Sequence, residues 1–318
     1  MRNSKIAIVI PFYSAEKHII DVVSQIPNFV DTLIVVDDKS PDVFPEKLVL
    51  DHLNNQVKLV CLKNNKNLGV GGATIQGFLY AINNDFQIVI KVDADNQMDL
   101  KYLPDLIEPL QKEKVQMTKG NRFKDINALS KMPFVRRMGN LMLSFITKMA
   151  TGYWNNFDPT NGYFAIQVNT LKKINFNNLS NRYFFETSLL SEMYFTHAII
   201  KDIPMPAIYA DEKSQMQLWK IPFEFSFKLI KLFFKRIVKQ YFLYDFNIGS
   251  VYLFFGLPLF LFGITYGIYN WIYYYVNEIL APTGTIMIVT LSIILGFQML
   301  LQAIQFDISQ APKANEEN

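Results

Sequence analysis

The chain has 318 residues, and 31 Lys and Arg against 28 Asp and Glu leave a formal net charge of only +3. We expect no nucleic-acid partner. Half of the residues are hydrophobic and 14% are aromatic, which is high for a purely soluble domain. The single cysteine, Cys61, excludes an internal disulfide and a cysteine-based zinc site and fits a reducing compartment.

The first part of the chain alternates short apolar strands with helices. Strands are indicated by β-branched apolar runs, and helices by apolar residues spaced three and four apart. The predicted strands are Lys5–Ile10, which stops at Pro11, Thr32–Val36, Val57–Leu62 and Ile88–Val92, and the predicted helices are Ala15–Ile26, with Ser14 as N-cap, and Thr74–Asn83. This alternation predicts an α/β fold with a mostly parallel sheet and right-handed crossovers.

Carboxylates follow two of these strands. Asp37 and Asp38 come after the second strand, and Asp93 and Asp95 come after the fourth. Ligands of parallel sheets bind at the carboxyl ends of strands, so we expect both pairs at one edge. Residues i and i+2 of an extended segment point the same way, so Asp93 and Asp95 would repel each other unless a cation lies nearby. Their oxygens suit Mg²⁺ or Mn²⁺, although an Asp-x-Asp pair alone is equally an ordinary polar strand end.

A glycine-rich turn, Asn67-Leu68-Gly69-Val70-Gly71-Gly72-Ala73, leads into the second helix. It superficially resembles the dinucleotide-binding loop of an oxidoreductase. That fingerprint follows the first strand of its unit, whereas the first strand here is followed by Pro11-Phe12-Tyr13. No acid pair suited to hydride transfer follows either, so an oxidoreductase is not favoured.

Short motifs follow one another in order over roughly the first two thirds of the chain. They are Pro11-x-Tyr13, Val36-Asp37-Asp38-x-Ser40, Asn67-x-Gly69-x-Gly71-Gly72-Ala73, Asp93-x-Asp95-x-Gln97, Gly120-Asn121-Arg122-Phe123, Arg136-Arg137-x-Gly139-Asn140 and Asp158-Pro159-Thr160-Asn161-Gly162-Tyr163. This ordered set resembles glycosyltransferase family 2, with its GT-A fold. Within that family, the Asp-Ala-Asp-x-Gln form is most similar to the dolichyl- or polyprenyl-phosphate sugar synthases.

The chain departs from the pattern of that family in three places. Ser14 and Ala15 stand where the family has Asn and Glu, which leaves Glu16 one place late. Lys39 replaces a glycine in the turn after the second strand, and Asn96 replaces an aspartate directly after the Asp-x-Asp motif.

The resemblance implies which residues form the site. Asp38 is expected to contact the base, Asp93 the ribose or base, and Asp95, with Gln97, is expected to hold Mg²⁺ or Mn²⁺ against the diphosphate. The full set expected to bind the nucleotide sugar is Pro11, Tyr13, Glu16, Asp37, Asp38, Asn67, Gly71, Asp93 and Ala94.

The region after the metal motif offers arginines instead of a general base. Arg122, Arg136 and Arg137 are candidates for gripping an acceptor phosphate, because guanidinium binds phosphate bidentately and stays charged. For Arg136 and Arg137, a solvated helix start is an equal alternative. A lipid phosphate has a second pKa of about 6 and arrives largely as a dianion, so it needs no base. We expect Asp95, Arg122 and Arg137 to be catalytic, with inversion of the anomeric centre as the resemblance implies.

Two apolar stretches near the C-terminus explain the excess of hydrophobic residues. Val251–Ile272 and Ile286–Phe306 carry no charge, and at about 1.5 Å per residue each spans the ~30 Å core of a bilayer. They are joined by the short segment Asn277–Thr283. Gln298 and Gln302 could hydrogen-bond to the first span or to another protomer. A homo-oligomer is therefore one of the alternatives.

The segment Ile221–Tyr244 precedes the first span and has amphipathic helical spacing. Its apolar stripe is Phe223, Phe227, Ile230, Phe234, Ile237 and Tyr241, and its lysines are Lys228, Lys231, Lys235 and Lys239. A basic helix with bulky aromatics is typical of the membrane interface; the alternative is a helix packed on the catalytic domain with a solvated lysine face. These lysines and Arg236 precede the first span, so the positive-inside rule predicts a cytoplasmic N-terminal domain. Because the chain crosses the membrane twice, the C-terminal tail is also expected in the cytoplasm.

We therefore predict a GT-A catalytic domain over residues 1–215, a juxtamembrane amphipathic region over 216–248, two transmembrane helices within 249–307 (about 250–273 and 284–306) and a cytoplasmic tail over 308–318. The predicted function is a membrane-anchored inverting glycosyltransferase that moves a sugar from a nucleotide diphosphate sugar to polyprenyl phosphate. The alternatives are a glycosyltransferase acting on a saccharide in cell-surface polysaccharide synthesis, and a non-enzymatic membrane scaffold with a degenerate nucleotide-binding domain. A processive synthase is disfavoured because Gln215-x-x-x-Trp219 lacks the arginine of the Gln-x-x-Arg-Trp segment.

Overall fold

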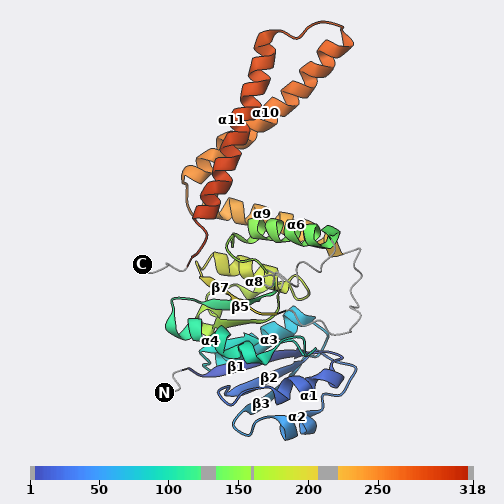
Figure 1. Ribbon diagram of the computed structural model, residues 1–318, viewed down its shortest axis with the longest axis vertical. Helices are drawn as coiled ribbons and strands as arrows, with labels where there is room; N and C mark the ends of the chain where they lie inside the picture. The colour runs from blue at the N-terminus through green and yellow to red at the C-terminus, as the bar shows by residue number, and fades with distance from the viewer. Residues whose placement is uncertain (1–3, 123–133, 159–160, 207–220, 314–318) are drawn as a thin grey trace. The chain divides into compact units, whose positions relative to one another are not determined.

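A computed structural model (Figure 1) describes residues 4–122, 134–158, 161–206 and 221–313. The chain divides into two compact units, the first formed by Met1–Leu232 with Pro312–Asn318 and the second by Phe233–Ala311. We call them the sheet unit and the hairpin unit, and each is described by itself.

The sheet unit is built on a seven-stranded sheet in the order β3-β2-β1-β4-β6-β5-β7. β6 is antiparallel to its neighbours β4 and β5, and the other pairings are parallel. The strands are β1 (Ile6–Phe12), β2 (Thr32–Asp37), β3 (Lys58–Lys63), β4 (Ile88–Lys91), β5 (Met117–Asn121), β6 (Phe164–Gln167) and β7 (Ile200–Pro204). The prediction of a mostly parallel α/β sheet is confirmed.

Helices cover both faces of this sheet (Figure 1). One layer holds α1 (Glu16–Ser24), α2 (Glu46–His52) and α4 (Leu103–Lys112), and the other holds α3 (Val70–Asn83), α7 (Val168–Leu171) and α8 (Phe185–Tyr194). Successive strand residues face opposite sides, so Ile8 packs in the first layer and Val9 in the second. A sheet buried on both faces needs apolar residues at every strand position, which explains the continuous apolar runs in the sequence.

Three predicted boundaries were wrong. β1 continues through Pro11, which pairs with Val36; proline is tolerated there because β4 ends at Lys91, opposite Val9, so no strand needs the missing N–H. The cap of α1 is Ala15, without a side-chain hydrogen bond, and not Ser14. α3 begins at Val70, not at Thr74, because tertiary packing overrides the poor helix propensity of its glycines.

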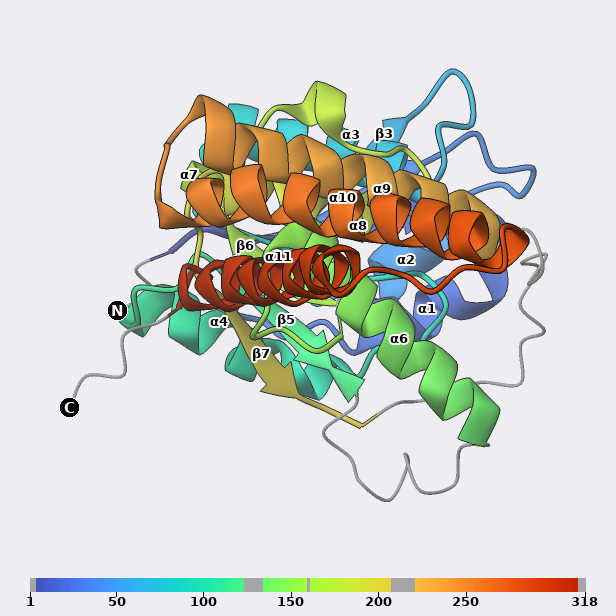
Figure 2. The same ribbon diagram turned by 90° about the horizontal axis from the view of Figure 1, so that it is seen from above.

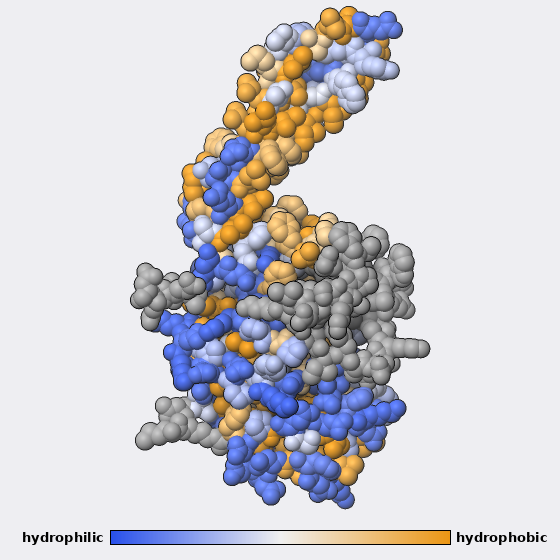
Figure 3. All heavy atoms as spheres, in the orientation of Figure 1, coloured by the Kyte–Doolittle hydropathy of each residue, from blue (hydrophilic) through white to orange (hydrophobic). Residues whose placement is uncertain are grey.

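The hairpin unit consists mainly of α10 (Ile248–Val276) and α11 (Thr283–Ser309), which run side by side in both views (Figure 1, Figure 2). Both helices are long and apolar enough to cross a membrane, and hydrophobic side chains cover much of their visible surface (Figure 3). Small residues allow close approach: a Cβ at Gly296 would lie 2.5 Å from the backbone nitrogen of Phe260. The two helices extend a few residues beyond the predicted spans.

The predicted amphipathic helix over Ile221–Tyr244 is divided in two. α9 (Ile221–Val238) is followed by a π-helical turn, η4 (Lys239–Leu243). Phe227, Ile230 and Phe234 of the expected apolar stripe are exposed, whereas Tyr241 is buried.

A buried ion pair joins η4 and the end of α9 to the end of α11 within the hairpin unit. Arg236 Nη1 and Nη2 donate to the two carboxylate oxygens of Asp307 at 2.7 and 2.9 Å, and the Tyr241 hydroxyl donates to Asp307 at 2.6 Å. Arg236 is fully buried, so it is not one of the exposed cations that the sequence predicts before the first span.

Breaking this pair from one side should destabilise the hairpin unit. Asp307→Asn should lower the free energy of unfolding by about 3 kcal/mol, because a buried guanidinium loses its countercharge. The double variant Arg236→Met, Asp307→Leu should recover most of the loss, because it removes both charges. Thermal unfolding of the full chain in detergent measures the difference.

The matched control is Glu108→Gln, which breaks the exposed pair between Glu108 and Lys112 and should leave the unfolding midpoint unchanged. Equal destabilisation by the single and double variants would contradict a role for the paired charges.

Candidate active site

The carboxyl ends of the parallel strands meet at one edge of the sheet. β2 ends at Asp37, in register with Phe12 of β1, and β4 ends at Lys91, two residues before Asp93. β2 and β4 lie on either side of β1, so the strand order reverses at this point. Such a switch point is where open α/β sheets bind ligands. The predicted convergence of the two carboxylate pairs at one edge is confirmed.

Asp37 and Asp38 differ in what they contact. Asp38 is buried, and its two oxygens accept hydrogen bonds from Asn64 Nδ2 at 2.7 Å and from the backbone nitrogens of Leu68 at 2.8 Å and Gly69 at 2.7 Å. Asp38 therefore holds the loop after β3 in place. Its oxygens, which we expected to contact the nucleotide base, accept hydrogen bonds from the protein instead. Asp37 is half-buried and accepts a hydrogen bond from the backbone nitrogen of Ser40 at 2.8 Å.

The glycine-rich turn allows α3 to pack closely on the segment before α8. A Cβ at Gly69 would lie 2.6 Å from the Asn181 carbonyl oxygen, and a Cβ at Gly71 would lie 2.4 Å from that of Ser180. Gly71 is buried, while Asn67 is exposed. Close packing therefore accounts for these glycines without a bound phosphate.

The turn after β2 keeps its geometry despite the departure at Lys39. Lys39 and Asn96 adopt left-handed conformations, with φ of +55° and +58°. Glycine adopts this region freely and asparagine tolerates it, whereas a lysine there carries backbone strain of about 1 kcal/mol. The Ser40 hydroxyl still accepts a hydrogen bond from the backbone nitrogen of Ser14 at 2.9 Å, which ties this turn to the end of β1. Beside it, Tyr13 and Glu16 are exposed and Pro11 is half-buried.

The Asp-x-Asp segment lies just past the end of β4, so strand alternation does not govern its side chains. Asp95 accepts a hydrogen bond from the backbone nitrogen of Gln97 at 3.1 Å. Gln25 Nε2 donates to Asn96 Oδ1 at 3.0 Å, which ties the segment to the end of α1. Ala94 is buried, and Asp93 and Asp95 are half-buried.

Lys91 offsets the charge that we expected to need a metal. Its Nζ lies 2.6 Å from Asp93 Oδ1 and 3.3 Å from Glu186 Oε1, and its side chain is 1% exposed. Burial opposes the charged form of Lys91, but the two carboxylates outweigh it and hold its pKa above the ordinary value. Lys91 is not among the site residues predicted from the sequence, although a lysine inside the apolar run Ile88–Val92 is unusual enough to signal one.

The strand β5 brings a second buried lysine and an arginine to the same edge. Lys119 donates from Nζ to the Asn161 carbonyl, and burial lowers its pKa to about 8. Arg122 forms a two-pronged contact with the buried Asp158, Nε to Oδ2 at 2.8 Å and Nη2 to Oδ1 at 3.1 Å. The Arg122 side chain remains 42% exposed, so Asp158 fixes its orientation while part of it stays accessible.

Arg136 and Arg137, the other arginines expected to bind phosphate, lie in the first turn of α6 (Phe134–Thr151). Their side chains fall outside the part of the chain that the structure describes.

The site fits a divalent ion that is coordinated partly by the protein and partly by the substrate. Among the described residues, no three His, Cys, Asp or Glu side chains gather as a ligand group. Asp95 and the Gln97 amide are hard oxygen donors, and Mg²⁺ is commonly held by one or two carboxylates together with substrate phosphates and water. The residues present therefore suit an ion bound together with a diphosphate.

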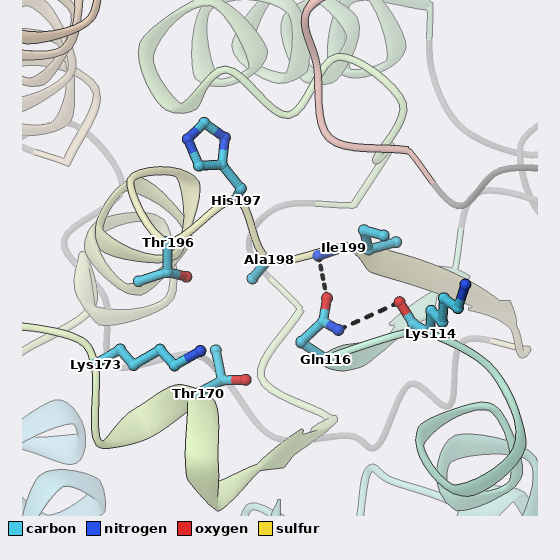
Figure 4. Close-up of a pocket in the computed structure, with 8 residues that line it drawn as sticks. All are labelled: Lys114, Gln116, Thr170, Lys173, Thr196, His197, Ala198 and Ile199. Atoms are coloured by element: carbon cyan, nitrogen blue, oxygen red, sulfur yellow. Dashed lines mark hydrogen bonds between the residues drawn. The ribbon is translucent and has the colours of Figure 1, made fainter. Parts of the chain in front are cut away.

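A separate cavity of about 370 Å³ lies at the opposite edge of the sheet (Figure 4). Its lining residues precede β5 and β7 or follow β6, the antiparallel strand. They are Lys114, Gln116, Thr170, Lys173, Thr196, His197, Ala198 and Ile199. Gln116 bridges this region, since its Oε1 accepts from the Ile199 nitrogen at 2.7 Å and its Nε2 donates to the Lys114 carbonyl at 3.3 Å. The cavity is not part of the candidate site.

Comparisons with known proteins agree with this geometry. The family model "Glycosyl transferase family 2" matches residues 7–174. UDP-N-acetylglucosamine--dolichyl-phosphate N-acetylglucosaminyltransferase of Methanococcus voltae is 30% identical over 223 residues, which cover 66% of this chain and 88% of that protein. Undecaprenyl-phosphate mannosyltransferase of Micrococcus luteus is 26% identical over 150 residues, 47% of this chain and 60% of that protein.

Solved structures show the same fold. A crystal structure of glucosyl-3-phosphoglycerate synthase from Mycobacterium tuberculosis superposes with a TM-score of 0.54 at 18% sequence identity. The match covers 74% of this chain and 81% of the synthase chain. Another crystal structure of the synthase, with a TM-score of 0.53, contains Mn²⁺, uridine diphosphate and glucosyl-3-phosphoglycerate. The GT-A fold that the motifs predict is thus confirmed, the chain is a glycosyltransferase, and it belongs to glycosyltransferase family 2.

Proposed function

We propose that this enzyme transfers one sugar from a nucleotide diphosphate sugar to polyprenyl phosphate and inverts the anomeric centre. The observation that carries the proposal is the meeting of acidic and basic groups at one sheet edge: Asp95 after β4 and the half-exposed, fixed guanidinium of Arg122 after β5. The named activities of the Methanococcus and Micrococcus relatives, both on a polyprenyl-type phosphate, support it.

The donor would bind at the switch point between β2 and β4. Asp37 lies half-buried at the end of β2 and is the carboxylate we assign to the nucleoside on that side, because Asp38 is engaged by the loop after β3. Asp93, with 28% of its side chain exposed, would accept a hydrogen bond from a ribose hydroxyl on the other side.

Asp95, with Gln97, would hold Mg²⁺ or Mn²⁺ against the donor diphosphate. When bound, the ion stabilises the negative charge that builds up on the leaving diphosphate. The backbone N–H of Gln97 holds the Asp95 carboxylate in place at 3.1 Å, so the ligand is oriented before the donor arrives. The Mycobacterium neighbour with Mn²⁺ and uridine diphosphate supports an ion in this fold.

Arg122 would bind the acceptor phosphate. A phosphate dianion is already a nucleophile, so no proton has to be removed as it attacks. The remaining task is to hold two anionic reactants in line at attack distance. A guanidinium whose direction is fixed by the buried Asp158 can do this without losing side-chain entropy at the moment of binding.

The helix α6 offers a surface for the lipid. Met138, Leu141, Met142 and Phe145 follow the i, i+3, i+4, i+7 spacing of one helix face, and all four are exposed. Exposed apolar patches mark contacts with membranes or with other proteins. We infer that α6, the apolar face of α9 and the two helices of the hairpin unit contact the bilayer, with the catalytic unit cytoplasmic because Lys228, Lys231, Lys235 and Lys239 precede the first span.

The direct test of this function uses the full chain in vesicles with polyprenyl phosphate and a panel of radiolabelled nucleotide sugars. Label from one donor should enter the organic phase only with Mg²⁺ or Mn²⁺. Asp95→Asn should lower turnover about a hundredfold, equivalent to about 2.7 kcal/mol of barrier. Asp105→Asn, on the exposed side of α4, is the matched control and should match the unaltered protein. Full activity in excess chelator would refute the metal assignment, and label in saccharide alone would refute the acceptor.

Arg122→Ala should raise the acceptor KM about tenfold or more while leaving nucleotide affinity unchanged, because Arg122 is assigned to the acceptor phosphate and not to the nucleotide. Asp158→Asn should raise the acceptor KM as well, because the guanidinium loses the carboxylate that orients it. Lys173→Ala, at the opposite sheet edge, removes a cation without effect on either constant. Steady-state kinetics and calorimetry with the nucleotide measure both. Unaltered acceptor kinetics in Arg122→Ala, or a product with retained configuration, would contradict the mechanism.

Met142→Asp should weaken turnover of a long-chain acceptor in bilayers about tenfold, because a charge on the α6 stripe opposes its contact with lipid. Turnover of a short, water-soluble polyprenyl phosphate should hardly change. Leu48→Asp tests a similarly exposed apolar residue on α2, and it should affect neither acceptor. If both variants behaved alike on the long-chain acceptor, α6 would not be a lipid contact.

A further inference from the structure

Lys91 is held between carboxylates from different parts of the fold. Lys91 is the last residue of β4, Asp93 lies in the segment that follows, and Glu186 is in the first turn of α8. Lys91 pairs with Phe164 of β6, whose ring belongs to the core beneath α3 and α8, so its side chain leaves the sheet on that side. The ammonium group thus connects the donor edge of the sheet to α8.

The space for this ammonium depends on a glycine. A Cβ at Gly162 would lie 2.4 Å from Lys91 Nζ, 2.9 Å from Asp93 Oδ2 and 3.3 Å from Glu186 Oε1. Gly162 has no positive φ, so conformational freedom does not explain the glycine; any side chain here would displace the ammonium. This accounts for the glycine in the motif Asp158–Tyr163.

The charges at this edge need such a partner. Asp93, Asp95 and Glu186 are three carboxylates, and the proposed donor adds an anionic diphosphate. Without a cation between them, Asp93 and Glu186, which both lie against Lys91 Nζ, would attract a divalent ion even without nucleotide. A contact of 2.6 Å between Lys91 and Asp93 is a strong charge-assisted hydrogen bond. It leaves Asp93 able to accept a hydrogen bond from a ribose hydroxyl but makes it a poor metal ligand.

We propose that Lys91 is a positioning residue that reserves Asp93 for the nucleoside and leaves Asp95 as the carboxylate for the metal. Glu186 and Gly162 keep the ammonium in place. The proposal rests on the proposed donor site, and it deepens that site by assigning the two carboxylates different tasks through a third residue. Its consequence is that the ion binds productively only together with the diphosphate.

The test compares Mn²⁺ binding without nucleotide, followed by electron paramagnetic resonance of the full chain in nanodiscs. Lys91→Met should tighten Mn²⁺ binding at least threefold, because Asp93 and Glu186 lose their countercharge. It should also raise the donor KM about tenfold, because Asp93 is no longer held for the nucleoside. If Lys91 had a purely structural role, Lys91→Met would weaken Mn²⁺ binding or leave it unaltered.

Two further variants keep the test valid if Lys91→Met folds poorly. Gly162→Ala displaces the ammonium without removing any charged group, and it should tighten nucleotide-free Mn²⁺ binding in the same direction. Glu186→Gln in the Lys91→Met background removes one of the released carboxylates and should reverse part of the tightening. Lys119→Met is the burial control, because it removes a buried lysine that does not contact Asp93, and its effect on Mn²⁺ affinity should be smaller than that of Lys91→Met.

Unaltered or weaker Mn²⁺ affinity in both Lys91→Met and Gly162→Ala would overturn the proposal. The measurements need no acceptor, so they stand even if polyprenyl phosphate is not the substrate. Binding of uridine and guanosine diphosphates with Mn²⁺ is measured in parallel on the unaltered protein. If neither diphosphate binds with the ion, the donor site itself is wrong, which is a separate failure from that of Lys91.

Discussion

Charge balance at the carboxyl edge of the sheet is the constraint on which the site depends. The fold brings β2, β4 and β5 to this edge, and each strand is followed by ionised groups. Left alone, the carboxylates after β2 and β4 would repel one another and any phosphate-bearing ligand. Charged groups at this edge have buried partners of opposite charge: the buried Lys91 pairs with Asp93 and Glu186, and the buried Asp158 pairs with the partly exposed Arg122. In each pair the buried residue, Lys91 or Asp158, orients the partly exposed one, Asp93 or Arg122.

The same logic separates two kinds of acidic residue that look alike in the sequence. Asp38 accepts three hydrogen bonds from the loop after β3 and its surroundings, whereas Asp37 is half-buried at the end of β2. Asp93 is neutralised, whereas Asp95 is oriented by the backbone of Gln97. Neighbouring carboxylates in one motif therefore have different tasks, and the difference arises from what each side chain contacts.

Local pattern was enough to predict β1 to β4, because strands buried on both faces must be apolar throughout, but it did not predict β5, β6 and β7. The shared edge of the Asp37 and Asp93 pairs followed from parallel topology. What local pattern could not supply were contacts between distant segments. Lys91 and Glu186 are 95 residues apart, and Arg236 and Asp307 are 71 apart, and nothing near either residue indicates its partner. The early start of α3 was missed for the same reason, because Gly69 and Gly71 at this start pack against Asn181 and Ser180, more than 100 positions away.

The central claim is that one carboxylate of the Asp-x-Asp motif binds metal while the other stays with Lys91. A structure of the full chain with Mn²⁺ and a nucleoside diphosphate, with the ion located by its anomalous scattering, tests this directly. The ion should be coordinated by Asp95 and diphosphate oxygens, with Asp93 still paired to Lys91 and facing the ribose. An ion bridged by Asp93 and Asp95, with Lys91 turned away, would contradict the claim.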